Sequence, residues 1–371
     1  MKKVTIICPV HQPTDIRIFK KEAMSLVNAG YKVSIIAKEC SGLIIKNNNI
    51  TVIGLNYKNR FYRFMSIPKI IFIALKERAD IYHIHNPDTL PIGLVLKLLK
   101  RKVIYDTHEN FRKKILLRIW IPKSLRRLTA YFIFYSEKLC SYTFDATIVT
   151  QEEQLREYTR SHLIGNSPLK SLRNDFNVNQ SIEGVIKLVY VGGISEDRGL
   201  RHMLKLNYFM NNIRPTQLCL IGPPINSLTI DSLIAITNDH DNVSYHGSLP
   251  QEVAFEIVKS SDYGLILLDD VADYRDTSPN KLFEYMMLGT PFIATEFPKW
   301  QKLLNKENAG FFIPVEEICF ALASKIIDER VDIDGYTNMA KSGIKFVNEK
   351  YNWSICDEPQ LIKLYQNLLE V

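Results

Sequence analysis

Short, nearly continuous apolar runs rich in β-branched residues alternate with stretches of helical spacing along the whole chain. Runs of this kind are typical of strands buried on both faces of a parallel sheet. We expect strands at residues 4–10, 32–37, 50–55, 81–85, 103–107 and 146–150, and then at residues 187–191, 217–221, 243–246, 263–268, 291–295 and 311–315. The alternation predicts an α/β protein.

Apolar residues recur at helical spacing between these strands. One stripe, which Gly30 ends as a C-terminal cap, consists of Phe19, Ala23, Leu26 and Val27. Another consists of Leu125, Leu128, Phe132, Tyr135 and Leu139. Each half of the chain has the pattern of a doubly wound unit, and the join lies near residues 164–168. Two such units facing each other form a cleft at the carboxyl ends of their strands, so we expect chemistry at the strand-to-helix junctions.

The composition is that of an ordinary folded protein. Of the 371 residues 46% are hydrophobic and 23% are charged, which excludes a disordered or collagen-like chain. The six cysteines are scattered without Cys-x-x-Cys spacing, so we expect no disulfide framework or structural zinc site. The N-terminal apolar run is too short for a secretion signal, and no run is long enough to span a membrane. The predicted location is the cytoplasm.

Charge is divided unevenly between the two halves. Residues 1–165 hold 28 Lys and Arg against 13 Asp and Glu, or +15, while residues 166–371 hold 19 against 27, or −8. A basic half suggests an anionic partner. Residues 56–78 and 112–127 combine basic with aliphatic and aromatic side chains, as an interfacial membrane anchor does. We expect an anionic membrane surface rather than nucleic acid, for which no motif is present. A solvated basic face with its apolar residues in the core is the alternative.

The segment over residues 276–291 is the strongest candidate for a ligand site. Ser278 suits a helix N-cap and Pro279 the first helical position, while Gly289 suits the position after the last turn. The sequence therefore predicts a helix over residues 279–288. Its N-terminus would offer free backbone N–H groups and the positive end of the helix dipole, which together favour a phosphate.

Charged residues in and before this helix fit a nucleotide. Lys281 adds a full positive charge near the helix N-terminus. Glu284, about a turn further on, can accept hydrogen bonds from ribose hydroxyls, and Asp276 lies eight residues earlier in the preceding loop. A well-capped structural helix with a solvent-facing Glu284 is the alternative interpretation.

A second candidate follows the strand predicted at residues 187–191. Gly192 and Gly193 allow a ligand to approach the backbone closely, and Arg198 could clamp a diphosphate from the side opposite Lys281. The segment is not Gly-x-Gly-x-x-Gly, and the chain has no Walker A loop, so dinucleotide and P-loop sites lack their signatures. A plain turn is the alternative.

Polar side chains also follow strands of the first half. His108, after the strand at residues 103–107, can hydrogen-bond a substrate hydroxyl or be satisfied by a neighbouring carboxylate. Asp15, after the first strand, can cap a helix or contact a substrate hydroxyl. His83 and His85 alternate along one strand, and because no third ligand has suitable spacing we expect a structural role rather than metal binding.

Taken in chain order, these motifs resemble glycosyltransferase family 4, a family of retaining sugar transferases with the GT-B fold. The most specific element is Ser278–Gly289. The other matching elements are His11, Asp15, Arg17, Asp106–Glu109, Val191, Arg198, Gly199, Gly222, Pro223, His246–Pro250 and the tail from Tyr351. The resemblance implies an acceptor-binding Rossmann-like domain at residues 1–165, a nucleotide-sugar domain at residues 166–350, and a helix at residues 351–371 that packs back on the first domain.

The resemblance also implies roles for individual residues. Arg198, Lys281 and nearby amides would hold the diphosphate, and Glu284 the ribose. The full set for the nucleotide sugar is Gly192, Gly193, Arg198, Gly222, Gly247, Ser248, Leu249, Ser278, Asn280, Lys281, Leu282 and Glu284. The catalytic set is His108, Asp276, Arg198 and Lys281, and the acceptor set is Asp15, Arg17 and Glu109. Positive side chains would replace a cation at the leaving group, so no metal or cofactor is expected.

The chain departs from the family pattern at two positions. Asp276 stands where the family has the first Glu of a Glu-x7-Glu pair, which shortens its reach by about one methylene. Gly193 stands where an Arg is common, which leaves the diphosphate to Arg198 and Lys281.

The implied reaction moves a sugar from UDP or GDP to a hydroxyl of a glycan or polyprenyl-diphosphate-linked acceptor, with retention, in cell-surface polysaccharide synthesis. Peripheral attachment to the inner face of the cell membrane goes with such an acceptor. One alternative is an isomerase of the nucleotide-sugar 2-epimerase kind, which needs no acceptor. The other is a non-catalytic, membrane-bound nucleotide-sugar sensor, which the two phosphate-site cations disfavour.

Overall fold

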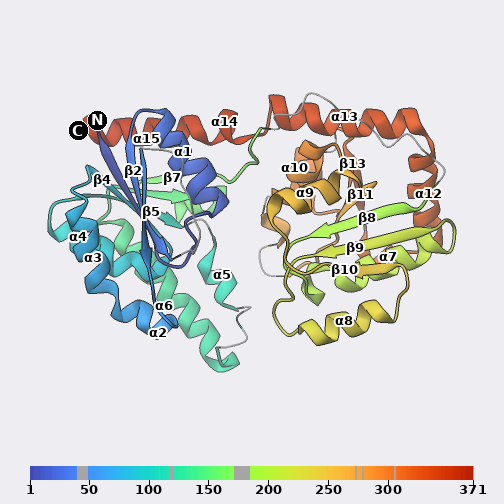
Figure 1. Ribbon diagram of the computed structural model, residues 1–371, viewed down its shortest axis with the longest axis horizontal. Coiled ribbons are helices and arrows are strands. Elements are labelled where there is room, and N and C mark those ends of the chain that lie inside the picture. Colours follow the sequence, from blue (N-terminus) through green and yellow to red (C-terminus); the bar gives the residue numbers. More distant parts are fainter. Residues whose placement is uncertain are drawn as a thin grey trace. The chain divides into compact units, whose positions relative to one another are not determined.

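The computed structural model describes residues 1–39, 49–107, 109–116, 118, 121–170, 184–271, 274–277, 280–304 and 306–370. The chain forms two compact units. The first contains Met1–Leu116, Ile121–Asn166 and Trp353–Val371, and the second contains Leu117–Trp120 and Ser167–Asn352. Each unit is a parallel sheet with helices packed against it (Figure 1), which confirms the predicted α/β class.

The sheet of the first unit has seven parallel strands in the order β3-β2-β1-β4-β5-β6-β7. The strands are β1 (Lys3–Cys8), β2 (Lys32–Lys38), β3 (Ile50–Leu55), β4 (Ile81–His85), β5 (Lys102–Thr107), β6 (Ala146–Val149) and β7 (Ser161–Leu163). The central strands β1 and β4 are buried almost throughout, as their continuous apolar runs predict. Strand β7 was not predicted because its three residues are not buried and form no apolar run.

Helices of the first unit begin and end at recognisable signals. Asp15 caps the π-helix η1 by accepting hydrogen bonds from the backbone N–H groups of Arg17 and Ile18, and Gly30 has a φ of 89° after the following helix. The helical elements are η1 (Ile16–Ala23), α1 (Met24–Asn28), α2 (Arg60–Met65), α3 (Ile67–Lys76), η2 (Pro87–Thr89), α4 (Leu90–Leu98), α5 (Phe111–Leu116), α6 (Lys123–Ser141), η3 (Glu152–Arg156), α14 (Trp353–Cys356) and α15 (Glu358–Glu370).

The C-terminal helix α15 packs on the first unit, as predicted. Its buried Tyr365 places its hydroxyl 2.8 Å from Nδ1 of His83 on β4. The indole N–H of Trp353 in α14 donates to the Ser25 hydroxyl at 2.8 Å. Burial of two large aromatic side chains, each with its polar atom hydrogen-bonded, anchors the end of the chain to the first sheet.

The sheet of the second unit has six parallel strands in the order β10-β9-β8-β11-β12-β13. The strands are β8 (Ile186–Val191), β9 (Thr216–Ile221), β10 (Val243–Tyr245), β11 (Tyr263–Ile266), β12 (Phe292–Thr295) and β13 (Gly310–Ile313). The helical elements are η4 (Glu196–Arg198), α7 (Leu200–Asn211), α8 (Ile230–Asn238), α9 (Gln251–Lys259), η5 (Tyr274–Asp276), α10 (Asn280–Leu288), α11 (Pro298–Leu304), η6 (Val315–Glu317), α12 (Phe320–Val331) and α13 (Ile333–Glu349).

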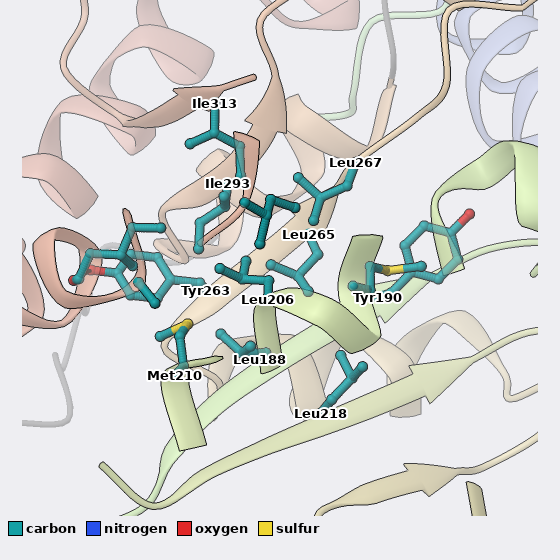
Figure 2. Close-up of a cluster of buried hydrophobic side chains, with 14 of the residues drawn as sticks. Leu188, Tyr190, Leu206, Met210, Leu218, Tyr263, Leu265, Leu267, Ile293 and Ile313 are labelled. Atoms are coloured by element: carbon teal, nitrogen blue, oxygen red, sulfur yellow. Dashed lines mark hydrogen bonds between the residues drawn. The ribbon is translucent and has the colours of Figure 1, made fainter. Parts of the chain in front are cut away.

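A large apolar core holds one face of this sheet against helix α7. Leu188 and Tyr190 of β8, Leu206 of α7 and Leu265 of β11 belong to it (Figure 2), and all four are fully buried. Tyr190 lies at the edge of this core with its hydroxyl pointing away from the other side chains. The core therefore fixes the carboxyl end of β8, where Gly192 and Gly193 follow.

Among the described helices, none combines the length and the apolar content that crossing a membrane would need.

Candidate functional site

Two cations flank the glycine pair that follows β8. Lys281, on the first turn of α10, places Nζ 3.2 Å from the Tyr190 hydroxyl and 4.6 Å from the centre of its ring. A Cβ atom on Gly192 would lie 2.0 Å from Lys281 Nζ, and one on Gly193 would lie 3.4 Å from Nη1 of Arg198. Any larger residue at position 192 would push against the lysine, so glycine leaves room for both cations at this strand end.

Among the described side chains, no acidic group neutralises either cation. Within the described residues no ion pair joins Lys281 or Arg198 to a carboxylate, whereas Arg201 pairs with Glu196 at 2.9 Å. Arg198 is partly buried and contacts the hydroxyls of Tyr190 and Tyr274. Two partly buried positive charges on either side of an open backbone turn favour the binding of an anion.

Tyr274, which contacts Arg198, is held in turn by the carboxylate of Asp197. The Tyr274 hydroxyl donates to Oδ2 of Asp197 at 2.7 Å, and the Asn226 side chain donates to Oδ1 at 2.9 Å. Burial works to raise the pKa of Asp197, but hydrogen bonds from Tyr274, Ser195 and Asn226 lower it below the usual value. Sequence reasoning missed Tyr190 and Tyr274, because a tyrosine in a core strand or a loop carries no motif.

Close backbone contacts join three of the predicted glycine positions. Gly222, after β9, has a φ of 134° and its N–H donates to the carbonyl of Gly247 at 2.7 Å. A Cβ atom on Gly222 would lie 2.0 Å from the Gly192 carbonyl oxygen. The structure thus brings Gly192, Gly222 and Gly247 to one edge of the second sheet, with partly exposed Leu249 and exposed Ser248 next in the chain.

Helix α10 is anchored to the same strand end. The Tyr285 hydroxyl accepts a hydrogen bond from the backbone N–H of Val191 at 3.1 Å, and the Tyr285 ring lies where a Cβ on Gly264 would clash. Leu282 is fully buried, while Asn280 and Glu284 are partly buried. The predicted cap residue Ser278 and Pro279 lie outside the described residues, and the described part of the helix runs from Asn280 to Leu288 as expected.

The loop that carries Asp276 is held by α11. Lys299 Nζ donates to the Asp276 carbonyl at 2.5 Å, and the Trp300 indole N–H donates to the Thr277 carbonyl at 2.6 Å. These bonds fix the backbone before α10, and the role of the Asp276 carboxylate near a sugar stays a prediction.

Polar side chains meet at the strand ends of the first unit. His11 places Nδ1 3.2 Å from Oδ2 of Asp15 and Nε2 2.8 Å from Nδ2 of Asn86. Asn86, directly after β4, has a φ of 70° and a ψ of 154°, a conformation that non-glycine residues rarely adopt. Asn86 was not predicted; the Asn-Pro pair after a strand was the signal that could have found it. Glu109 pairs with Lys114, and His108 lies outside the described residues.

Arg17 has a different position from the one predicted. Its guanidinium is buried and pairs with Glu22 at 2.9 Å and with Asp106 at 2.8 Å, and it also donates to the Gly165 and Ile164 carbonyls. Because Arg17 is buried, it cannot contact an acceptor. The predicted acceptor role of Arg17 is therefore wrong, and Arg17 is a structural cation.

His83 and His85 have two carboxylate neighbours that the spacing along the sequence did not predict. Glu22 and Asp106 come from distant parts of the sequence, and with the two histidines they place four ligand atoms within 4.8 Å of one another. Arg17 already supplies positive charge to both carboxylates. Burial raises the pKa of Glu22 to about 8 despite Arg17, and burial lowers the pKa of His85 to about 4.

A second buried carboxylate lies on the other side of β5. Glu137 of α6 accepts hydrogen bonds from Tyr105 at 2.6 Å, Thr107 at 2.9 Å and Tyr158 at 3.3 Å. Burial raises the pKa of Glu137 to about 7, although the three hydroxyls act to lower it. Thr107 is the last residue of β5, so this network fixes the strand just before Glu109.

In the described part of the chain, the carboxyl end of the second sheet carries two cations without a carboxylate partner around a glycine turn. Such an arrangement favours an anionic ligand, and the comparisons with known proteins add the class of protein. The model of Glycosyltransferase Family 4 matches residues 20–174, and the model of Glycosyl transferases group 1 matches residues 185–328. These are the two halves of a glycosyltransferase with the GT-B fold. Both models describe glycosyltransferases, and the first of them confirms over residues 20–174 the resemblance to glycosyltransferase family 4 that was drawn from the motifs.

Solved structures of similar fold cover the whole chain. The sucrose-phosphate synthase of Thermosynechococcus elongatus is 20% identical, with 100% of both chains covered and a TM-score of 0.73. Anabaena HepE in complex with UDP-glucose is 10% identical, with 100% of both chains covered and a TM-score of 0.69. A putative UDP-N-acetylglucosamine 2-epimerase of Listeria monocytogenes is 13% identical, covering 98% and 94%, with a TM-score of 0.56. Among curated protein sequences none matches this chain significantly.

Proposed function

We propose that this glycosyltransferase moves a sugar from a UDP- or GDP-linked donor to a hydroxyl of a glycan or lipid-linked acceptor, with retention of configuration, in cell-surface polysaccharide synthesis. The observation that carries the proposal is the placement of Arg198 and Lys281 beside Gly192 and Gly193 without an acidic partner in the described residues. A diphosphate would supply the negative charge that these two cations lack in the described residues. The structure of HepE was solved with UDP-glucose, which makes UDP the first nucleoside diphosphate to test.

In the proposed reaction the bond between the anomeric carbon and the diphosphate oxygen breaks. Negative charge then develops on the leaving phosphate, where Arg198 and Lys281 stabilise it more strongly than in the ground state. The acceptor hydroxyl attacks from the same face and its proton passes to the leaving phosphate oxygen. We propose that these two cations take the place of a metal ion, and that Glu284 accepts hydrogen bonds from the ribose. The predicted roles of His108 and Asp276 at the sugar belong to the same proposal.

Binding measurements test the donor site. Arg198→Met and Lys281→Met should each weaken UDP binding about tenfold to hundredfold, because each removes a charged hydrogen bond of about 1.5–3 kcal/mol. The matched control is Arg201→Met, which removes a cation that is already paired with Glu196. Isothermal titration calorimetry measures the affinity of each variant for UDP and for uridine, and the affinity for uridine should change little. Normal UDP affinity in both variants would contradict the proposal.

Product analysis tests the rest of the reaction. Retention predicts that the new glycosidic bond has the anomeric configuration of the donor, which NMR of the product reports. Treatment with a chelator should leave the rate of transfer unchanged, since the cations come from the protein. Inversion at the anomeric carbon would rule out the same-face route and would direct attention to Glu109 or Asp15 as a general base.

The alternative function is isomerisation of a nucleotide sugar, and the similarity in fold to the putative epimerase favours testing it. Incubation with a UDP-sugar in the absence of any acceptor separates the two. An isomerase would convert the donor to its epimer, whereas a transferase would leave it intact or hydrolyse it slowly.

A further inference from the structure

Helix α6 has an apolar face on each side. Its inner face packs Ala130 against Ile115 and Ile121 and buries Phe134. Its outer face, together with Tyr142 just after its last turn, carries six large side chains at alternating spacings of three and four residues. We call them the α6 ridge: Leu125, Leu128, Phe132, Tyr135, Leu139 and Tyr142, each between 49% and 71% exposed. A surface helix normally directs polar residues outward, so this face lacks its expected partner.

Helices α2 and α3, which belong to the same unit (Figure 1), carry a second set of exposed and mostly aromatic side chains, here called the aromatic cluster. It consists of Phe61, Tyr62, Phe64, Met65 and Phe72, which are between 49% and 67% exposed. Exposed hydrophobic residues are ordinary when they stand alone. Runs of them on one helix face mark an interaction surface.

Cationic side chains lie directly beside these aromatic rings. Arg112 lies over Tyr131, which stacks on Tyr135 of the ridge, with 5.5 Å to the ring centre. Lys76 lies over Phe72 with 4.4 Å, and Arg63 over Phe64 with 5.6 Å. Long basic side chains that lie along exposed apolar rings can keep their charged ends at the level of lipid headgroups while the rings enter the acyl boundary.

The charge around the α6 ridge selects the partner. Residues 110–142 contain eight Lys and Arg and one acidic residue, Glu137, which is buried and faces Tyr105. A second copy of this chain docked on the ridge would bring two such positive faces together, which Coulomb repulsion opposes. An anionic lipid surface satisfies both the apolar ridge and the surrounding charge.

We propose that the α6 ridge, with the aromatic cluster of α2 and α3, inserts into the headgroup region of an anionic membrane. The proposal moves the membrane contact predicted from residues 56–78 and 112–127 onto the outer face of α6 as far as Tyr142. It deepens the proposed function, because a lipid-linked acceptor would be reached at such a surface. Its test does not depend on transfer activity.

The test is co-sedimentation of the full chain with phosphatidylcholine vesicles and with vesicles that also contain phosphatidylglycerol. The ridge variant combines Leu128→Gln, Phe132→Gln and Leu139→Gln. The matched control combines Tyr208→Gln, Ile230→Gln and Phe320→Gln, three exposed side chains of the second unit at 60%, 56% and 54% exposure. We expect the ridge variant to lose anionic-vesicle binding by about tenfold or more, and the control to bind like the unmodified chain.

Charge is tested separately with Lys123→Ser and Arg127→Ser, two exposed basic residues of α6. This pair should weaken binding at low salt and have little effect at high salt, where screening already removes the electrostatic part. UDP affinity, measured on every variant, reports whether the second unit is intact, and circular dichroism and thermal melting report whether the first is.

Several results would overturn the proposal. One is vesicle binding by the folded ridge variant equal to that of the unmodified chain. Another is a concentration-dependent dimer that the ridge variant abolishes while the unmodified chain ignores vesicles, which would assign the ridge to a second copy. Equal binding to neutral and anionic vesicles would overturn the anionic preference. Vesicle binding without any sugar transfer would refute the proposed function and leave the membrane surface standing.

Discussion

The two units share one strand order but use their strand ends in opposite ways. In each sheet the order reverses beside the first strand, between β1 and β4 in one unit and between β8 and β11 in the other, which is where open α/β sheets bind ligands. In the first unit His11 and Asn86 bridge that point through a hydrogen bond. In the second, glycines leave the backbone open to Lys281 and Arg198.

The distribution of glycines expresses this difference. Five of the six glycines with positive φ lie in the second unit, and Gly30 at the end of a helix is the one in the first, among the described residues. In the first unit, polar side chains instead form buried networks around Arg17 and Glu137. A shared topology therefore fixes where a site can lie, and local residues decide whether that point stays open, as the proposed donor site requires, or is filled by polar side chains.

The largest expected effect comes from filling the open site of the second unit. Gly222→Ala would place a Cβ 2.0 Å from the Gly192 carbonyl oxygen at a φ of 134°, so the Gly192 turn must move. We expect UDP affinity to fall about hundredfold, the loss typical of a displacement near 1 Å in a site. Gly54→Ala in β3, where the nearest atoms belong to Glu39 at 3.3 Å, is the matched control and should leave UDP affinity unchanged. Titration calorimetry compares the two, and an unaffected Gly222→Ala would break the contrast between the units.

The buried carboxylates of the first unit should make the free energy of unfolding depend on pH. The folded-state pKa of Glu137 is about 7 against an ordinary value of 4.5, so the folded state holds this proton more tightly than the unfolded chain does. The stabilisation is complete below about pH 4.5 and is lost as pH rises through about 7, by roughly 1–3 kcal/mol. Glu22 adds a change of the same sign, lost as pH rises through about 8.

Glu137→Gln tests this assignment, because glutamine keeps the shape and does not titrate. Urea unfolding at a series of pH values from 5 to 8 should show a flatter decline for the variant than for the unmodified chain, by about the share given to Glu137. An unchanged slope in the variant would contradict the buried-carboxyl assignment. Only the difference between the variant and the unmodified chain is decisive, because the lowered pKa values of the buried His83 and His85 change stability with pH in the opposite direction.

The smallest predicted effect concerns the tyrosine behind the cation pair. Tyr190→Phe removes a hydroxyl that accepts from Lys281 and donates to the Gly193 carbonyl at 2.8 Å. We expect about fivefold to tenfold weaker UDP binding with little change in uridine binding, since a hydrogen bond of about 1 kcal/mol orients the cation. Tyr208→Phe, on an exposed tyrosine of α7, is the control. Equal loss for UDP and uridine would indicate a general structural defect instead.

Patterns among residues near in sequence predicted most of the strands and two of the helices. Twelve predicted strands occur in the structure, and the helix before Gly289 and the stripe ended by Gly30 occur as well, because strand and helix signals are carried by residues near in sequence. The short strand β7 escaped, since three partly exposed residues have no period to detect. The sequence also placed Gly192, Gly193, Arg198 and Lys281 at junctions, and the structure brings them together.

What the sequence determined by itself is the α/β class, the strand-end positions of the residues in the proposed donor site and the basic character of the first half. Tertiary structure decided what lies far apart in the chain. Arg17 meets Asp106, 89 residues away, and so becomes a buried structural cation rather than an acceptor contact. Tertiary structure also decided which side of α6 faces inward. The stripe Leu125–Leu139 repeats every 3.6 residues on average and so predicts a helix with an apolar face. The same repeat arises whether that face is buried in the protein or exposed to a partner.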